Sequence, residues 1–368
     1  MAANDYALLV GISRYRDAEQ FPTLGGPLND VARVREWLTD TASGASVPTE
    51  NVLTLTTTQE LQDLPLTGWP PSTVWSPNRE LFSRMFTGIA LDEAGNMIRR
   101  EGRLYLYFSG HGFSLNEDDT PSAALFSADN HGLVHTNLAG TAYAAAVKRA
   151  RLFKEVVLIM DCCRDVLNNY GYNLPDFNRV ENPGADTVKV YSLYAAPRRG
   201  KSQERELPDS DGKVVGLMTH AMLRALKEAP CDVAGQVAGR VLSQVIAFNW
   251  TSWYSEGPRP PAPRGVSPDQ GDVYFRSRQP LISVDFNCAT PLLPGTSLRL
   301  KSDLLNALGE VKSTSVTWRD GSYSWVQEIP LTRDAQQFTL LLPTGKHDLV
   351  VGSNIYSFDP RESNAIAF

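Results

Sequence analysis

Two stretches of the chain carry residue types that can catalyse acyl transfer. The stretch "VVLIMDCCRD" (156–165) places two adjacent cysteines, Cys162 and Cys163, after an apolar run, and "RLYLYFSGHG" (103–112) places His111 after another. A cysteine thiolate attacks a carbonyl carbon, and a histidine takes up and returns the proton that this reaction moves. The two stretches therefore predict a cysteine nucleophile with a histidine as its general acid and base.

Each of these residues also has a structural interpretation. A histidine in a glycine-rich turn often has no catalytic role, and a buried cysteine at a strand end often packs as a small hydrophobic residue. Gly110 and Gly112 flank His111, which leaves the imidazole open to a cleft and lets backbone N–H groups approach a substrate oxyanion. His111 also precedes Cys163 by about 50 residues, a separation typical of caspases. The combination favours catalysis.

The elements around both stretches predict an α/β fold. Strands that alternate with helices indicate a mainly parallel sheet flanked by helices, and reactive groups gather beyond the carboxyl ends of such strands. Both stretches end a candidate strand, so the fold would bring them to one edge of the sheet. The candidate strands are 6–12, 51–57, 103–110, 155–161 and 188–196, and the helix-like segments are 25–38, 79–99, 139–153, 216–228 and 232–248.

The first helix and three loops complete this part of the chain. Asn29 and Asp30 resemble a helix N-cap, and apolar residues follow them at helical spacing. The loops 57–78, 165–187 and 197–214 interrupt the alternation of strands and helices. The apolar residues of the first helix are Val31, Val34, Trp37 and Leu38.

The C-terminal part of the chain has a different texture. After a proline-rich segment (256–272), short alternating strands with Gly, Asp and Pro turns follow, which predicts a small all-β, sandwich-like domain. A length of 368 residues also favours two domains, here 1–277 and 281–368. Nothing in the second domain looks catalytic, and His347 is expected to be exposed at a turn. This domain could bind a protein partner, sense a small-molecule activator or buttress the catalytic sheet.

Composition excludes several classes of function. A net charge of -6 argues against a general nucleic-acid or anionic-membrane surface, and no apolar run reaches the roughly 18 residues of a membrane helix. The first residues lack the features of a signal peptide. The four cysteines, which include Cys231 and Cys288, suggest neither a disulfide framework nor a zinc site. A cytoplasmic chain without nucleic-acid or membrane partners is expected.

Several motifs in sequence order resemble one family. The chain is similar to the caspase-like cysteine peptidases, nearest to bacterial caspase-like proteins and metacaspases, over roughly residues 4–277. The resemblance implies a caspase-like sheet and a cysteine endopeptidase acting on protein or peptide substrates; it permits a role in bacterial stress or antiphage defence. The motifs that carry it are "YALLVGISRY", "LGGPLNDVARVREWL", "YFSGHG", "DCCRD" and "YSLYAAPRRGKSQERE" with "DGKVVGLMTHAMLRAL".

The resemblance also assigns roles to single residues. The family's nucleophile directly precedes a His or Arg, which points to Cys163, and Cys162 then packs as a small residue. His111 would be the general acid and base, and the backbone N–H groups of Gly112 and Cys163 would form the oxyanion hole. The alternative is a catalytically idle caspase fold that acts as a scaffold or receptor through its C-terminal domain. The intact His/Cys pair argues against it, and the chain lacks the "GxSxG" motif of other α/β hydrolases.

The resemblance further bears on which bond is cut. Family members that cleave after Asp bind that side chain with arginines, and the matching positions here read Leu24 and, in "SQER", Glu204. The metacaspase-type specificity (S1) positions instead correspond to Asp30, Ser109 and Asp161. Carboxylates there favour a cationic guest through charge-assisted hydrogen bonds. Cleavage after Arg, and secondarily Lys, is expected, although an N-cap role for Asp30 and a strand-end role for Ser109 stay open.

Two further features of the family are calcium binding and self-cleavage. The acidic clusters that bind calcium in some metacaspases are not recognisable, so no cofactor is expected. Asp118, Asp119 and Asp129 are calcium candidates by composition only. Family members are often cut after the nucleophile, and Arg179 is the one basic residue of the loop 165–187, which makes it a candidate for self-cleavage. The charged loop 197–214 is a second candidate, although the favoured interpretation is a solvated loop at the substrate groove.

Overall fold

The computed structural model divides into two compact units. Contacts group Met1–Leu223 with Tyr254–Val273 as unit 1, and Arg224–Trp253 with Tyr274–Phe368 as unit 2. The predicted boundary near residue 280 stays a prediction, since this grouping places 224–253 with the C-terminal residues. The structure describes residues 4–62, 72–115, 122–131, 135–167, 169–175, 182–229, 236–255, 261–269, 271–276, 282–293, 297–302, 325–330, 335–342, 347–359 and 365–367.

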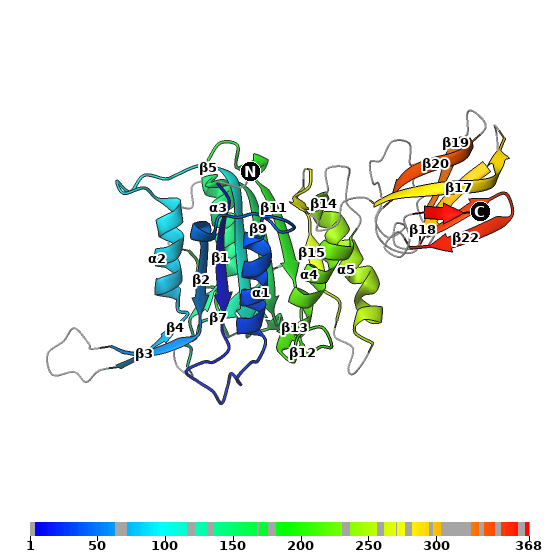
Figure 1. Cartoon of the computed structure of the whole chain (residues 1–368). Coiled ribbons are helices and arrows are strands. Elements are labelled where there is room, and N and C mark those ends of the chain that lie inside the picture. The colour runs from blue at the N-terminus through cyan, green and yellow to red at the C-terminus, as the bar shows by residue number, and fades with distance from the viewer. Residues whose placement is uncertain are drawn as a thin grey trace. The chain divides into compact units, whose positions relative to one another are not determined.

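A mainly parallel sheet forms the centre of unit 1 (Figure 1), which confirms the predicted fold class. It has six strands in the order β15-β11-β9-β5-β1-β2, and only β15 runs antiparallel to its neighbour. The strands are β1 (Tyr6–Gly11), β2 (Val52–Thr56), β5 (Arg100–Gly110), β9 (Phe153–Cys162), β11 (Lys189–Tyr194) and β15 (Arg264–Val266). The carboxyl-terminal halves of the four inner strands β1, β5, β9 and β11 are almost continuously buried, as parallel strands covered on both faces require.

Helices cover both faces of this sheet. On one face α2 (Arg79–Ala90) and α3 (Gly140–Ala150) share a core with the even-numbered residues of β9 and β5. On the other face α1 (Pro27–Thr39) packs Trp37 edge-on against Tyr105, with ring centroids 5.8 Å apart. The predicted apolar face of α1 is buried: Val31, Val34, Trp37 and Leu38.

The N-cap assignment for Asn29 and Asp30 was wrong. Helix α1 begins at Pro27, because proline lacks a backbone N–H and is preorganised for the first helical position. Asp30 therefore lies within the first turn, where its side chain is fully buried. Its burial has to be explained by long-range partners.

Short strands lie in the connections of unit 1. A four-stranded sheet joins β10 (Asp165–Val166), β6 (Gly112–Ser114), β7 (Ala124–Phe126) and β8 (Asn137–Leu138). Two hairpins pair β3 (Thr58–Gln62) with β4 (Ser72–Ser76), and β12 (Glu204–Glu206) with β13 (Val214–Gly216). Single turns of 3-10 helix cover Thr49–Asn51 and Ala185–Thr187. The loops 57–78 and 197–214 thus contain hairpins that their polar composition did not predict.

Helix α4 (Leu217–Glu228) follows β13, and the division between the two units falls within it. In unit 2, α5 (Gly239–Trp253) follows β14 (Gln236–Ala238), which pairs with β16 (Tyr274–Arg276). Two small sheets then agree with the all-β prediction, in the orders β20-β17-β23 and β19-β18-β21-β22. Their strands are β17 (Ile282–Leu292), β18 (Ser297–Ser302), β19 (Trp325–Pro330), β20 (Ala335–Leu342), β21 (His347–Val351), β22 (Asn354–Phe358) and β23 (Ala365–Ala367).

The expectation of an exposed His347 was wrong. This residue starts β21, and its buried ring lies beside that of Phe358 on the paired strand, with centroids 5.6 Å apart. The turn before His347 suggested an exposed side chain, but packing against the ring of Phe358 on the paired strand covers it.

Within the described part of the chain, no helix is long and apolar enough to cross a membrane.

Candidate active site

The pairing of β5 with β9 brings the two predicted motifs to one edge of the sheet. In this parallel register Ser109 lies opposite Asp161, and Gly110 lies opposite Cys162. His111 follows Gly110 at the end of β5 and Cys163 follows Cys162 at the end of β9, so both residues leave the sheet at the same point. This is the carboxyl edge, where the polar residues of an α/β sheet are expected to gather.

The two adjacent cysteines have different surroundings. Cys162, the last residue of β9, is fully buried, and its sulfur fills the space that a Cβ on Gly112 would need. Cys163 lies just beyond the strand and is only half-buried, with its Sγ 3.9 Å from the carbonyl oxygen of Ser202. Both thiols are free, and the accessible one is Cys163.

Neither thiol is preset as a thiolate. Burial raises the pKa of Cys162 well above its usual value and also raises the pKa of Cys163, although the positive charge of Lys201 opposes the second shift. Cys163 is therefore protonated in the free protein at neutral pH. A nearby base would have to remove its proton during the reaction.

Its contacts hold the His111 ring in one tautomer. Its backbone N–H donates to the hydroxyl of Tyr15 at 2.7 Å, and its Nε2 lies 2.8 Å from the carbonyl oxygen of Pro22. A carbonyl oxygen only accepts, so Nε2 carries the proton and Nδ1 has the free lone pair. Burial lowers the pKa of His111, although the hydrogen bond to Pro22 opposes this shift. The lowered pKa keeps the ring neutral at neutral pH.

The rings of Tyr15 and Phe21 enclose this imidazole, with centroids 5.2 and 5.8 Å from that of His111. The backbone before it is unusual: Gly110 has a φ of 149°, a conformation that side chains rarely allow, and a Cβ there would meet the Tyr15 hydroxyl. Gly110 and Tyr15 together fix where the histidine leaves the strand.

Asp30 and Asp161 converge on Gly216 from two elements. Asp30 of α1 accepts the backbone N–H of Gly216 at 3.0 Å, and the hydroxyl of Ser109 lies 3.4 Å from its Oδ2. A Cβ on Gly216 would collide with both carboxylates, so only glycine fits between them. The structure thus brings together the three predicted specificity residues.

Asp161 of β9 has its own set of donors. The hydroxyl of Ser202 donates to Oδ1 at 2.9 Å, and Thr219 donates to Oδ2 from its backbone N–H at 3.1 Å and its hydroxyl at 2.6 Å. The Thr219 hydroxyl also contacts the hydroxyl of Tyr107 at 2.6 Å. Helix α4 and the segment before β12 therefore fix the Asp161 carboxylate, and Tyr107 of β5 in turn contacts the Thr219 hydroxyl.

The two buried carboxylates destabilise each other's ionised form. Burial, followed by the negative charge of Asp161, raises the pKa of Asp30 well above its usual value, while the Gly216 N–H and the charge of Arg33 oppose this shift. Burial also raises the pKa of Asp161, against the hydrogen bonds from Thr219 and Ser202. A bound cation would relieve this repulsion.

Glu204 joins these carboxylates, although the sequence did not identify it as a partner of theirs. Its carboxylate accepts the backbone N–H groups of Gly25 and Gly26, both at 2.8 Å, at the start of α1. Its negative charge adds to the rise in the pKa of Asp30. We call Asp30, Asp161 and Glu204 the acidic cluster. The signal that could have found Glu204 is its position in "SQER", where an arginine would stand in an Asp-specific relative.

The remaining predicted residues lie elsewhere. Arg179, Asp118 and Asp119 fall outside the described residues. Asp129 accepts the hydroxyl of Thr136 at 2.8 Å. Among the residues that the structure describes, no group of three or more His, Cys, Asp or Glu side chains is arranged to hold a metal ion. The oxyanion hole of Gly112 and Cys163 stays a prediction.

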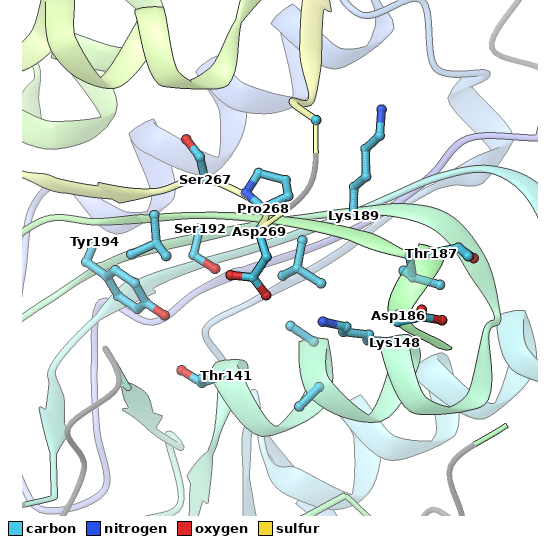
Figure 2. A pocket seen from close by; sticks show the side chains of 16 residues that line it. Thr141, Lys148, Asp186, Thr187, Lys189, Ser192, Tyr194, Ser267, Pro268 and Asp269 are labelled. Atoms are coloured by element: carbon cyan, nitrogen blue, oxygen red, sulfur yellow. The ribbon is translucent and has the colours of Figure 1, made fainter. Parts of the chain in front are cut away.

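A separate cavity of about 630 Å³ lies between α3, β11 and the segment 266–271 (Figure 2). Thr141 and Lys148 line it from the helix, and Tyr194 lines it from the strand. None of the predicted site residues borders this cavity.

Comparisons with known proteins show no family for this chain. No family model matches the sequence, and no curated protein matches it. Among solved structures, a crystal structure of caspase-1 from Spodoptera frugiperda is similar over 76% of this chain and 92% of that chain. Its sequence identity is 11% and its TM-score is 0.41. The case for an active site therefore rests on the geometry of this chain.

Proposed function

We propose that the chain is a caspase-like cysteine endopeptidase that cleaves peptide bonds after basic residues, Arg first and Lys second. The observation that carries the proposal is the convergence of the buried carboxylates of Asp30 and Asp161 on Gly216, at the sheet edge where Cys163 and His111 emerge. An acidic site beside a half-buried thiol and a neutral histidine suits a peptide whose basic side chain binds next to the bond that is cut.

The reaction would use the tautomer that Pro22 fixes. Nδ1 of His111 takes the Sγ proton as the Cys163 sulfur attacks the carbonyl carbon, and the carbonyl electrons move to the oxygen. The N–H groups of Gly112 and Cys163 would stabilise that oxyanion. The C–N bond then breaks, and the imidazolium gives its proton to the leaving amine. Water, deprotonated by His111, attacks the thioester and releases the carboxylic acid and the Cys163 thiol.

The acidic cluster explains the preference for arginine. A guanidinium has a planar fork of N–H donors that matches carboxylates, and its charge is never lost at neutral pH. Its binding favours the ionised forms of Asp30 and Asp161, which the free protein disfavours. An aspartate side chain would add a further negative charge to the same site and would be rejected.

Fluorogenic peptides that end in Arg, Lys or Asp test the proposal on the full-length chain. We expect hydrolysis in the order Arg, Lys and then almost none for Asp, with Cys163→Ala as the inactive control. Hydrolysis of the Asp peptide alone would overturn the specificity argument.

A thiol-reactive probe with an Arg side chain tests the chemistry separately. It should label wild type and Cys162→Ala but not Cys163→Ala. Absence of labelling under every activating condition would instead favour the idle scaffold that acts through its C-terminal residues.

A further inference from the structure

The hairpin β12–β13 supplies one carboxylate of the acidic cluster and a backbone donor to another. Glu204 lies on β12, and the backbone N–H of Gly216, which Asp30 accepts, lies on β13. The hairpin is anchored to α1 on one side, where the side-chain amide of Asn29 donates to the carbonyl of Val214 at 2.8 Å. If the cluster binds the basic side chain as proposed above, the position of this hairpin determines the geometry of that binding.

A second anchor holds the turn of the hairpin to α4. Nε2 of His220 lies 2.9 and 3.0 Å from the two carboxylate oxygens of Asp209, in the turn between β12 and β13. The His220 side chain is only 4% exposed, whereas that of Asp209 is 63% exposed. A buried imidazole thus extends one ring nitrogen toward a carboxylate at the surface.

The proton on Nε2 of His220 can be assigned from its partner. Nδ1 of His220 lies 2.7 Å from the hydroxyl of Tyr254, and that hydroxyl lies 3.0 Å from the carbonyl oxygen of Leu217. A carboxylate only accepts, so Nε2 of His220 carries a proton and donates to Asp209. The imidazolium and the neutral ring with its proton on Nε2 both make this contact, since the Tyr254 hydroxyl can accept from Nδ1–H or donate to Nδ1.

Arg33 of α1 adds a positive charge near Asp209 and near Asp30. Although burial alone would raise it, the hydrogen bond and charge of His220, together with Arg33, hold the pKa of Asp209 below its usual value. The neighbours thus favour an ionised Asp209, which is the acceptor that the Nε2–H of His220 contacts.

We propose that Asp209 and His220 are positioning residues that pin the β12–β13 turn to α4 and thereby hold Glu204 and Gly216 at the acidic cluster. Without the Asp209 carboxylate, the Nε2–H of the buried His220 ring loses its charged acceptor and the turn is released.

Hydrogen–deuterium exchange of residues 203–216 tests this anchor without any need for catalysis. We compare protection, relative to the intrinsic exchange rate, at pH 7 in wild type, Asp209→Asn and Asp211→Asn. Asp211 is the matched control, since it is an exposed aspartate of the same turn with a φ of 53°, which Asn tolerates. Asp209→Asn should lose about two- to fivefold protection relative to wild type, the range for a partly exposed ion pair.

Asp209→Asn keeps the shape of the side chain but removes the carboxylate that His220 contacts, while Asp211→Asn should follow wild type. Identical profiles for all three proteins would overturn the inference. Because Asp209 is exposed, this variant should fold, which a substitution of the buried His220 does not guarantee.

Kinetics with an Arg peptide then link the anchor to substrate binding. At the same pH, Asp209→Asn should raise KM about two- to fivefold and leave kcat within about twofold. A shifted exchange profile with unchanged KM would remove the link to the acidic cluster. If the exchange profile shifts but no protein cleaves the peptide, the hairpin anchor stands and the proposed peptidase function fails.

Discussion

The acidic cluster and the residues His111 and Cys163 share one edge of the sheet through Asp161, yet the protein holds them differently. Asp30 and Asp161 receive hydrogen bonds from the start of α4, from β13 and from the segment before β12. Nε2 of His111 contacts the carbonyl oxygen of Pro22, and Sγ of Cys163 lies near that of Ser202 at 3.9 Å. The carboxylates are fixed by several side-chain and backbone donors, whereas these contacts of His111 and Cys163 are with backbone carbonyls.

The electrostatics of the two regions differ in the same sense. In the cluster, burial gathers carboxylates whose pKa values it raises, so the site is strained toward accepting a proton or a cation. In the pair, burial lowers the pKa of the histidine and raises that of the cysteine, so both groups are neutral. Under the proposed function, substrate charge would be recognised by a prearranged site, whereas the charges of the reaction would form only during catalysis.

The largest expected effect separates the two cysteines. Cys163→Ala removes the proposed nucleophile and should lower kcat/KM for an Arg peptide by at least about 10³-fold, to the assay background. Cys162→Ala should keep most of the activity, because Cys162 only packs beneath Gly112. Steady-state kinetics on both variants, with circular dichroism to confirm folding, provide the measurement. An active Cys163→Ala protein would place the chemistry elsewhere.

The next effect concerns the cluster. Asp161→Asn keeps the shape of the side chain but removes its charge, so kcat/KM for the Arg peptide should fall about 10- to 100-fold, the usual range for a lost charge-assisted hydrogen bond. The rate of alkylation of Cys163 by a small neutral reagent should stay within about twofold. That pairing of results separates recognition from reactivity. An equal fall in both rates would mean that the two regions are not independent.

A smaller effect is expected from Glu204, at the periphery of the cluster. Glu204→Gln keeps an acceptor for the N–H groups of Gly25 and Gly26 but removes one negative charge. We expect KM for the Arg peptide to rise about three- to tenfold with little change in kcat, since a uniform loss of binding raises KM alone. Glu206→Gln, an exposed change on the same short strand, is the control. Equal KM values for both variants would exclude Glu204 from recognition.

The same contrast explains what could be predicted from the sequence. The alternation of apolar runs predicted the parallel sheet, and strand ends predicted that Ser109, Asp161, His111 and Cys163 would emerge together, because parallel strands share their carboxyl edge. The helical spacing on α1 predicted its buried face. These are local patterns that one segment carries by itself.

The contacts that complete the site are not local. Glu204 caps the glycines before α1, and His220 reaches Asp209 and Tyr254 through the folding of distant segments. Polar residues of these kinds look the same in a solvated loop, which is why the hairpin β12–β13 was not predicted. His347 was misjudged for the same reason, since its burial depends on Phe358 of the paired strand.

The smallest predicted effect is on stability and distinguishes a binding site from a folding element. The pKa of Asp30 is raised in the folded protein, so the protonated form of this carboxyl stabilises the fold. This stability is fully present below the pKa of the unfolded chain, near 3.9, and is lost as the pH rises through the pKa of the folded protein. Asp30→Asn is neutral throughout. Its melting temperature should match that of wild type near pH 4 and exceed it at pH 8, at roughly 2–4 °C for each kcal/mol.

Thermal unfolding at these two pH values, with Asp211→Asn as the exposed control, provides the measurement. The same Asp30 variant should cleave the Arg peptide more slowly, because the repulsion that destabilises the free protein is what a cationic side chain relieves. A variant that is less stable at pH 8 would show that Asp30 mainly holds the Gly216 N–H for folding. In that case the carboxylates would be structural, and the distinction between a strained recognition site and a neutral catalytic pair would no longer hold.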